Sequence, residues 1–263
     1  MSADIRASVC MATYNGAAYV AEQIESIVAQ LGPDDELVIV DDCSTDDTTA
    51  VIVQTAARLE ESRILLTKTD SNLGYVRAFE AAIRRSRGRF VFLSDQDDVW
   101  TAGRHEAMIE GLGRALVVAG NHSILGRSGK RLWYPPLRAA GSRRHLANLV
   151  AIMIGYRPYF GCAMGFRREV IEGGILPIPG FVTESHDIWI AITGNVRRSI
   201  RHLEQDVVER RLHGGNQTPL GIRGLRTILE ARVRFARMIV VAKQRAVLAR
   251  VAGTTRAAQR PTR

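Results

Sequence analysis

Five carboxylates stand where residue type and spacing best support chemistry. They are Asp41, Asp42, Asp95, Asp97 and Asp98. Two of them directly follow the apolar run 36–40, and the other three, with Gln96 among them, follow the run 89–94. Five carboxylates in one crevice repel one another unless a cation lies among them, and oxygen ligands suit Mg²⁺ or Mn²⁺ shared with phosphates. The pattern predicts a divalent metal site that also binds phosphate.

The elements that position these carboxylates alternate between strand and helix patterns. Strands are expected at 5–12, 36–40, 63–67 and 89–94, and helices at 18–30, 46–59 and 76–86. Strands separated by helices of this length imply a mostly parallel sheet. The ligand crevice of such a sheet lies beyond the carboxyl ends of its strands, so a third polar group, Thr13-Tyr14-Asn15-Gly16, should meet the two acidic clusters there.

Each acidic cluster also has a purely structural explanation. The segment 41–46 could be an exposed turn followed by a helix N-cap, and 95–98 could be another turn. Either explanation accounts for one cluster taken alone. Two clusters at successive strand ends, after a third polar strand end, favour a ligand site instead.

An ordered set of motifs in the first hundred residues resembles glycosyltransferase family 2, the inverting enzymes of the GT-A fold. The motifs are Val9–Asn15, Val38–Asp46, Asn72-Leu73-Gly74 and Asp95–Trp100. The resemblance implies an α/β fold of GT-A type, with a mostly parallel central sheet flanked by helices. It also implies a nucleotide-diphosphate sugar as the donor.

The resemblance assigns roles on the donor side to particular residues. Those that it places at the nucleotide sugar are Thr13, Tyr14, Asn15, Asp41, Asp42, Asp95 and Gln96. The acid-x-acid element, Asp95 and Asp97, corresponds to the family's metal and diphosphate site. Mg²⁺ or Mn²⁺ is therefore the expected cofactor.

The resemblance continues into the second half of the chain. Gly161–Phe166 is similar to the family's small-residue segment near the acceptor, and Glu184–Trp189 is similar to its catalytic-base motif, although many members have Glu-Asp where this chain has His186-Asp187. An acceptor hydroxyl is a poor nucleophile, so a carboxylate must take its proton as it attacks. Asp187 is the expected general base, with His186 and Trp189 on the acceptor side.

Three motifs point to one branch of the family. His186-Asp187-x-Trp189, Asp95–Trp100 and Arg211–Asn216 are similar to the rhamnosyltransferase-like branch that builds bacterial surface polysaccharides. This implies transfer of L-rhamnose from dTDP-rhamnose to a saccharide or polyprenyl-linked saccharide. The alternatives are a UDP-hexose donor and a non-catalytic nucleotide-binding relative.

Several single residues keep two interpretations. His213 could complete the metal shell or contact the diphosphate, or it could be an ordinary loop histidine. Arg77, just after Asn72-Leu73-Gly74, could face the diphosphate or be an exposed helix charge. Trp100 and Trp189 could stack on sugars or lie in the core or crevice wall.

Charge and regularity divide the chain into a body and a tail. Residues 1–219 are expected to form one domain with a nucleotide-sugar half, 1–100, and a less regular acceptor half, 101–219. The tail, 220–263, holds eleven Lys or Arg and one acid, a net charge of +10 against −1 for the rest. Its apolar residues have helical spacing, which predicts a basic helix lying on an anionic membrane or packed on the body.

The remaining sequence features predict a cytoplasmic protein, either free or attached peripherally to the inner face of the cell membrane. The three cysteines have no paired or metal-ligand spacing, no signal-peptide pattern stands at the N-terminus, and no apolar run has the length of a membrane span. The basic tail alone would suggest nucleic-acid binding, which is not expected here because the body is nearly neutral.

Two other enzyme and signalling classes fit less of the sequence. A phospho-acceptor receiver domain also uses an acid pair at a strand end with Mg²⁺, but it is much shorter and gives no role to Asp187 or to 95–98. A nucleotidyltransferase would have a glycine-rich basic phosphate loop after the first strand. Thr13-Tyr14-Asn15-Gly16 is not such a loop.

Overall fold

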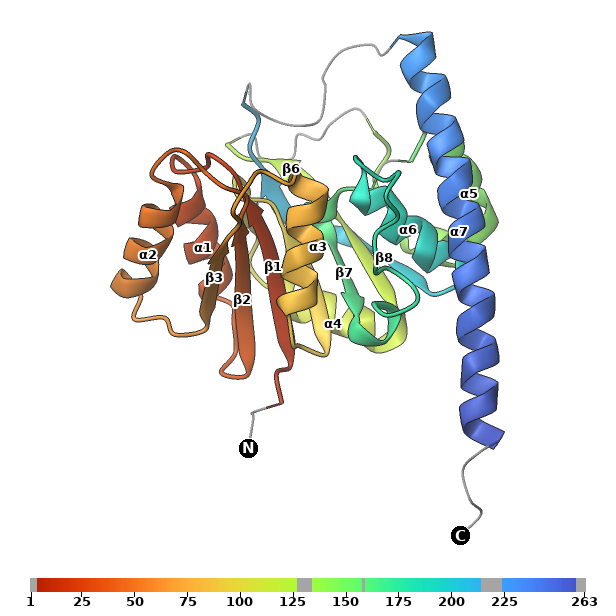
Figure 1. Ribbon diagram of the computed structural model, residues 1–263, viewed down its shortest axis with the longest axis horizontal. Coiled ribbons are helices and arrows are strands. Elements are labelled where there is room, and N and C mark those ends of the chain that lie inside the picture. Colours follow the sequence, from red (N-terminus) through yellow and green to blue (C-terminus); the bar gives the residue numbers. More distant parts are fainter. Residues whose placement is uncertain (1–3, 127–133, 158, 214–223, 259–263) are drawn as a thin grey trace.

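The computed structural model describes residues 4–126, 134–157, 159–213 and 224–258. Within them, eight strands form one sheet in the order β3-β2-β1-β4-β7-β6-β8-β5. Their bounds are β1 Ala7–Thr13, β2 Asp35–Asp41, β3 Ile64–Lys68, β4 Phe90–Ser94, β5 Val99–Trp100, β6 Val117–Ile124, β7 Met164–Arg167 and β8 Ile200–Arg210. Strands from both halves of the body therefore share a single sheet (Figure 1).

Seven α-helices are described around this sheet. They are α1 Val20–Val28, α2 Thr48–Arg58, α3 Tyr75–Arg85, α4 Arg104–Arg114, α5 His145–Ile154, α6 His186–Val196 and α7 Leu225–Ala258. Short 3-10 helices cover Ala139–Arg143, Gly161–Ala163 and Arg168–Val170. The strands and helices expected in the first hundred residues are all present, with ends that differ by one or two residues.

The first four strands in chain order form the parallel part of the sheet. β1 lies between β2 and β4, and β3 lies outside β2, all in parallel register. Thr13 pairs with Asp41, and Met11 pairs with Ser94, so these strands end at the same edge. This register brings the three polar strand ends together, as the sequence predicts.

The second half departs from a wholly parallel arrangement. β7 is antiparallel to both β4 and β6, and β5 pairs antiparallel with β8 at the outer edge. β6 and β8 are parallel to each other, so β8 ends on the same side as β4. The expected mostly parallel sheet is confirmed, with β5 and β7 as its exceptions.

Helices cover both faces of the sheet and bury two apolar layers (Figure 1). On one face, α3, α6 and α7 contribute Phe79, Trp189 and Met238 to a core cluster. On the other face, α1, α2 and α4 contribute Ile24, Ile52 and Met108 to a second cluster. Alternate strand side chains feed the two layers, because successive residues of a strand point to opposite faces.

The C-terminal helix α7 packs along α6 and α5 with one of its faces. Met238 and Ala242 on that face are buried. Arg245 donates hydrogen bonds to the carbonyl oxygens of Gly174, at 3.0 Å, and Pro177, at 2.8 Å. One face of the expected basic helix is thus attached to the body. Among the described helices, none is both long enough and apolar enough to cross a membrane.

Candidate active site

The loops after β1 and β4 are joined by a pair of hydrogen bonds through Gln96. The amide N–H of Tyr14 donates to Gln96 Oε1 at 2.8 Å, and Gln96 Nε2 donates to the carbonyl oxygen of Tyr14 at 3.1 Å. The Tyr14 side chain itself is 46% exposed at this edge. Gln96 therefore holds the backbone of Tyr14, whose aromatic ring is partly exposed to solvent.

The loops after β1 and β2 are joined in a similar way through Asn15. Its N–H donates to Ser44 Oγ at 2.9 Å, and its Oδ1 accepts the N–H of Thr45 at 2.9 Å. Asn15 has a φ of 48°, in the left-handed region that asparagine tolerates better than most residues. The two loops are thus held together before any ligand binds.

The carboxylates of Asp41 and Asp42 are engaged inside the protein. Asp41 is fully buried and accepts hydrogen bonds from the hydroxyls of Thr13, at 2.9 Å, and Ser44, at 2.5 Å. Asp42 accepts the N–H groups of Leu73, at 2.7 Å, and Gly74, at 2.9 Å. Both carboxylates position loops in this structure, and contact with a nucleotide stays a prediction for them.

A compact acidic cluster lies at the carboxyl end of β4. Ligand atoms of Asp95, Asp98 and Cys162 all lie within 4.8 Å of one another. Burial first, and then the charges of neighbouring carboxylates, raise the pKa of Asp95 and of Asp98 well above the ordinary value. Burial also raises the pKa of the Cys162 thiol. Burial and mutual repulsion therefore oppose full ionisation of this cluster unless a cation compensates its charge.

Two buried arginines face the acidic cluster from the protein interior. Arg210, at the end of β8, is 6% exposed, and its Nε and Nη1 have no hydrogen-bond partner among the described residues. Burial alone would lower the Arg210 pKa, but the acidic groups around it raise it. Arg104 is fully buried, donates to the carbonyl oxygen of Leu93 at 3.0 Å, and has a pKa lowered to about 10 by burial. The two arginine cations therefore neutralise part of the negative charge of the acidic cluster.

Asp97 and His213 meet on the outer side of the same cluster. His213 Nε2 lies 2.8 Å from Asp97 Oδ2, and the His213 ring stacks on Tyr19 with centroids 4.7 Å apart. The neighbouring Arg211 donates its N–H to Asp98 Oδ1 at 3.1 Å and its Nη2 to Glu22 at 2.5 Å. The residues after β8 are thus fastened to those after β4.

The residues at this edge fit a divalent cation. Asp98 Oδ2 is buried and has no hydrogen-bond partner among the described residues, so it remains available as a ligand atom. Asp95, Asp97 and Asp98 offer the oxygen donors that Mg²⁺ or Mn²⁺ prefer, and the nearby His213 ring offers nitrogen. Cys162 is a softer donor that suits neither ion. The carboxylates would hold the cation, and Cys162 would pack beside it.

Asp187 occupies the first turn of α6, and its charge reaches the same cluster. Burial raises the pKa of Asp187 to about 6, opposed by the N–H of Ile188, which donates to Oδ1 at 2.7 Å, and by the Arg210 cation. The charge of Asp187 in turn contributes to the raised pKa of Asp95. The expected general base therefore lies within electrostatic range of the expected metal ligands.

His186 and Trp189, predicted to lie on the acceptor side, are buried in this structure, and contact with an acceptor stays a prediction for them. His186 is 5% exposed and stacks on Phe79 with centroids 4.5 Å apart, and burial lowers its pKa to about 4. Trp189 is fully buried and donates its Nε1–H to the carbonyl oxygen of Ile175 at 2.9 Å. Both rings are parts of the core on which α6 is built. Trp100, at 4% exposed, is likewise a core residue.

Arg77, predicted to face the diphosphate, is engaged elsewhere in this structure, and its contact with a diphosphate stays a prediction. Its guanidinium forms a salt bridge with Glu80 on the same helix and donates to the carbonyl oxygens of Ile178, at 2.8 Å, and Pro179, at 3.2 Å. These bonds turn the side chain toward the loop before α6. Arg77 joins α3 to that loop and is not among the groups around the acidic cluster.

Sequence reasoning missed both buried arginines and the part played by Cys162. Arg210 ends β8, a strand whose middle is interrupted by Glu204, Gln205 and Asp206, so its period was hard to recognise. A cation at the carboxyl end of a strand, in a chain with several acids at other strand ends, is the signal that could have identified it. Asp98 was recognised as one of the five carboxylates, but not as the most buried carboxylate of the cluster.

Comparison with known proteins places the chain among glycosyltransferases. It is 28% identical over 222 residues to the uncharacterized glycosyltransferase alr2836 of Nostoc, covering 81% of this chain and 66% of that protein. It is 39% identical over 100 residues to the succinoglycan biosynthesis protein ExoO of Rhizobium meliloti, covering 38% and 28%. The chain thus spans less than two thirds of these relatives.

A third relative has a more specific description. It is a UDP-Glc:alpha-D-GlcNAc-diphosphoundecaprenol beta-1,3-glucosyltransferase, WfgD, of Escherichia coli. Identity is 30% over 106 residues, which covers 40% of this chain and 40% of WfgD.

Solved structures show the same fold. Staphylococcus aureus TarS in complex with UDP-GlcNAc superposes with a TM-score of 0.67 at 19% identity, covering 89% of this chain and 66% of that one. The mannosyltransferase PcManGT of Pyrobaculum calidifontis, with GDP-Man and Mn²⁺, gives 0.57 at 20% identity, covering 98% and 76%. The expected GT-A type fold is confirmed. The sequence model of glycosyl transferase family 2 matches residues 8–174, more than half of the chain, and the protein therefore belongs to that family.

Proposed function

We propose that the protein is a metal-dependent inverting glycosyltransferase that moves a sugar from a nucleotide-diphosphate donor to an acceptor hydroxyl. The observation that carries this proposal is that Asp187, in the first turn of α6, lies within electrostatic range of Asp95, a member of the acidic cluster. A base and a diphosphate-binding centre within electrostatic range are what a single displacement requires. Neither a receiver domain nor a simple binding module has a use for both.

Asp187 acts as the general base in this proposal. The acceptor oxygen attacks the anomeric carbon, the bond from that carbon to the diphosphate breaks, and the hydroxyl proton moves to Asp187. Its pKa of about 6 keeps the carboxylate ionised at neutral pH and makes it a stronger base than an ordinary aspartate. One displacement of this kind inverts the configuration at the anomeric carbon.

The opposite charges around the cluster serve the departing diphosphate. Arg210 and Arg211 lie beside Asp95, Asp97 and Asp98, where they can stabilise phosphate oxygens as negative charge develops. A bound Mg²⁺ or Mn²⁺, held by the carboxylates with His213, would supply further stabilisation as a Lewis acid. The presence of Mn²⁺ in the related mannosyltransferase structure supports this choice of cofactor.

The preorganised loops after β1 and β2 are proposed to hold the nucleotide. The Tyr14 ring is exposed, and Gln96 holds the Tyr14 backbone through hydrogen bonds. Asn15 accepts the N–H of Thr45 and so holds the loop after β2. In this proposal residues 1–100 have the donor role and 101–219 the catalytic-base role, and 220–263, which contain α7, are an added tail. Residues 214–223 lie outside the described part, so the Gly214–Asn216 stretch of the third branch motif is not described.

Two donors are proposed for the transferred sugar. The sequence motifs favour dTDP-rhamnose, whereas the name of WfgD and the UDP-GlcNAc bound to TarS favour a UDP-hexose. The same relative's diphosphoundecaprenol acceptor supports a polyprenyl-linked saccharide, and the succinoglycan protein supports a role in cell-surface polysaccharide synthesis. A cytoplasmic location stays a prediction from the sequence.

A transfer assay tests the proposal. The chain is incubated with Mn²⁺, a panel of dTDP-, UDP- and GDP-sugars, and saccharide and polyprenyl-linked acceptors, and the anomeric configuration of any product is determined by NMR. Inverted product from one donor supports the proposal and names the sugar. Retained configuration would contradict the role of Asp187 as a base in a single displacement.

A further inference from the structure

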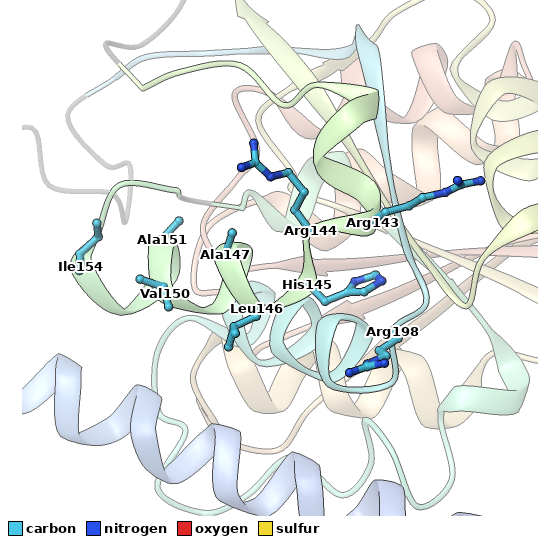
Figure 2. Close-up of a pocket in the computed structure, with 9 residues that line it drawn as sticks. All are labelled: Arg143, Arg144, His145, Leu146, Ala147, Val150, Ala151, Ile154 and Arg198. Atoms are coloured by element: carbon cyan, nitrogen blue, oxygen red, sulfur yellow. The ribbon is translucent and has the colours of Figure 1, made fainter.

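The helix α5 presents a row of apolar side chains to solvent, beside basic residues of the neighbouring segments. Leu146, Val150 and Ile154 recur at every fourth residue and are 77%, 52% and 66% exposed. They line an open groove of about 820 Å³ together with Arg143, Arg144 and Arg198. Figure 2 shows these side chains as sticks. Isolated exposed aliphatic residues are ordinary, but a row of them next to three arginines marks an interaction surface. The groove is distinct from the acidic site.

The helix α7 carries a second exposed apolar row. Leu229, Val233, Val240, Val247 and Val251 are all more than half exposed. With 3.6 residues per turn, these five fall within a sector about 40° wide, opposite the buried Met238 and Ala242. The packing of α7 on the body therefore leaves this row facing outward.

Cations border the row on both sides. By the same helical geometry, Arg226 and Arg237 lie along one border, and Lys243 and Arg250 lie along the other. All four are exposed, and no acid occurs between 231 and 251. An apolar stripe between two lines of cations is the pattern of a helix that lies in the plane of a membrane interface.

The two helices contact each other and lie at the same end of the molecule, away from β3 and α2 (Figure 1). The sequence around α5 contains no Asp or Glu from 111 to 168. We propose that α5 and α7 together form one surface that docks on a bilayer of anionic phospholipids. The aliphatic rows enter the interface, and the arginines bind the lipid phosphates.

A second copy of this chain fits the surface less well. Pairing two such surfaces would bring Arg143, Arg144 and the α7 cations of each copy close to those of the other, with only Glu230 in the tail to compensate. Anionic headgroups instead complement the cations on it, of which Arg226 already forms a salt bridge with Glu230. The inference deepens the proposed function, because a polyprenyl-linked acceptor would lie in such a bilayer, but vesicle binding tests it without any acceptor.

Vesicle flotation of the full chain tests the docking surface. The vesicles are phosphatidylcholine alone and phosphatidylcholine mixed with phosphatidylglycerol. We expect binding to the mixed vesicles, weakened roughly tenfold or more by R143E/R144E and to a similar degree, about tenfold, by L146S/I154S or V240S/V247S. Val53→Ser on α2 and Arg85→Glu on α3, both exposed positions elsewhere, are the matched controls and should bind as the unaltered chain does.

Two results would overturn the docking surface. One is equal vesicle binding by the surface variants and the controls. The other is a dimer in sedimentation equilibrium that V240S/V247S dissociates while vesicle binding is unchanged, which would assign the stripe to a second copy. Thermal melting of each variant verifies its fold. Nucleotide-sugar affinity without vesicles separates the two proposals, because a chain that binds donor but no vesicle refutes only the docking.

Discussion

The two sides of the candidate active site differ in how far their polar groups are satisfied within the protein. In the loops after β1 and β2, Asp41, Asp42 and Asn15 have hydrogen-bond partners at normal distances. Around β4 and β8, Asp98 Oδ2 and two nitrogens of Arg210 are buried without partners among the described residues. The first side is built in advance, whereas the second keeps buried polar atoms without hydrogen-bond partners, which are proposed to serve a ligand and a cation.

This difference explains why the acids of the two sides behave differently. Asp41 and Asp42 stabilise their loops by accepting N–H and O–H groups, as capping residues do elsewhere. Asp95 and Asp98 have raised pKa values because burial and mutual repulsion oppose their charge. The proposed catalysis therefore uses the side of the site where buried polar atoms have no hydrogen-bond partners within the described fold.

Replacing Asp187 by asparagine should have the largest effect on catalysis. The amide keeps the shape of the side chain but cannot take the acceptor proton, so kcat should fall by about 10²–10⁴-fold. Calorimetric donor affinity should stay within about threefold of the unaltered chain, since the remaining groups around the cluster are unchanged. Normal turnover by this variant would remove Asp187 from the role of base.

Replacing Arg210 by methionine should cause the largest loss of stability on the unsatisfied side. Removing one partner of a buried ionic group leaves uncompensated charge and costs on the order of 3–5 kcal/mol. Because the pKa values of Asp95 and Asp98 are raised, these groups protonate as the pH falls, and the loss should shrink toward acidic pH. Thermal melting from pH 5 to pH 8 measures this, with Arg210→Lys as the matched control. A loss independent of pH would show that Arg210 acts mainly through its packing on Phe160.

Replacing Asp42 by alanine tests the satisfied side. Two backbone N–H groups, those of Leu73 and Gly74, would lose their acceptor, at a cost of about 1–3 kcal/mol. The loss should be the same with Mn²⁺ and with chelator, because Asp42 serves the loop. Chemical denaturation in the two conditions compares them. A loss that appears only with Mn²⁺ would move Asp42 to the metal side of the site.

The dependence of kcat on pH should give the smallest of these effects. Asp187 must be ionised to act, and its pKa is raised to about 6, so kcat should fall as the pH drops through about 6, by about tenfold for each further unit. An aspartate with its ordinary pKa would remain active to near pH 4. Single-turnover rates at saturating donor and Mn²⁺ isolate this step from metal binding. A flat profile down to pH 5 would contradict the raised pKa of Asp187.

Local patterns were sufficient to predict the first half of the fold. Each buried strand there ends in polar residues, and each helix has clear apolar spacing, so their order and the meeting of their ends followed from the sequence. β5 and β7 have two and four residues, too few to show a period. The antiparallel exceptions in the sheet could therefore not be predicted from the pattern.

The directions of single side chains were beyond the reach of sequence patterns. Arg77 and His186 stand in the right motifs, yet Arg77 turns to the loop of Ile178 and His186 turns under Phe79. Tertiary contacts between segments about a hundred residues apart decide both. The same limit applies to Arg210, because its role depends on the acidic groups around it, and only the tertiary structure brings those groups together.

Calorimetric titration of nucleotide sugars, with Mn²⁺ and with chelator, tests the central claim most directly. The account predicts that one donor binds with Mn²⁺ and at least about tenfold more weakly with chelator, since the clustered carboxylates after β4 need a cation before a diphosphate can approach them. Asp97→Ala should abolish that difference. Equal affinity in both conditions, or no binding of any donor, would contradict the claim that the unsatisfied side of the site is built for a metal-bound diphosphate.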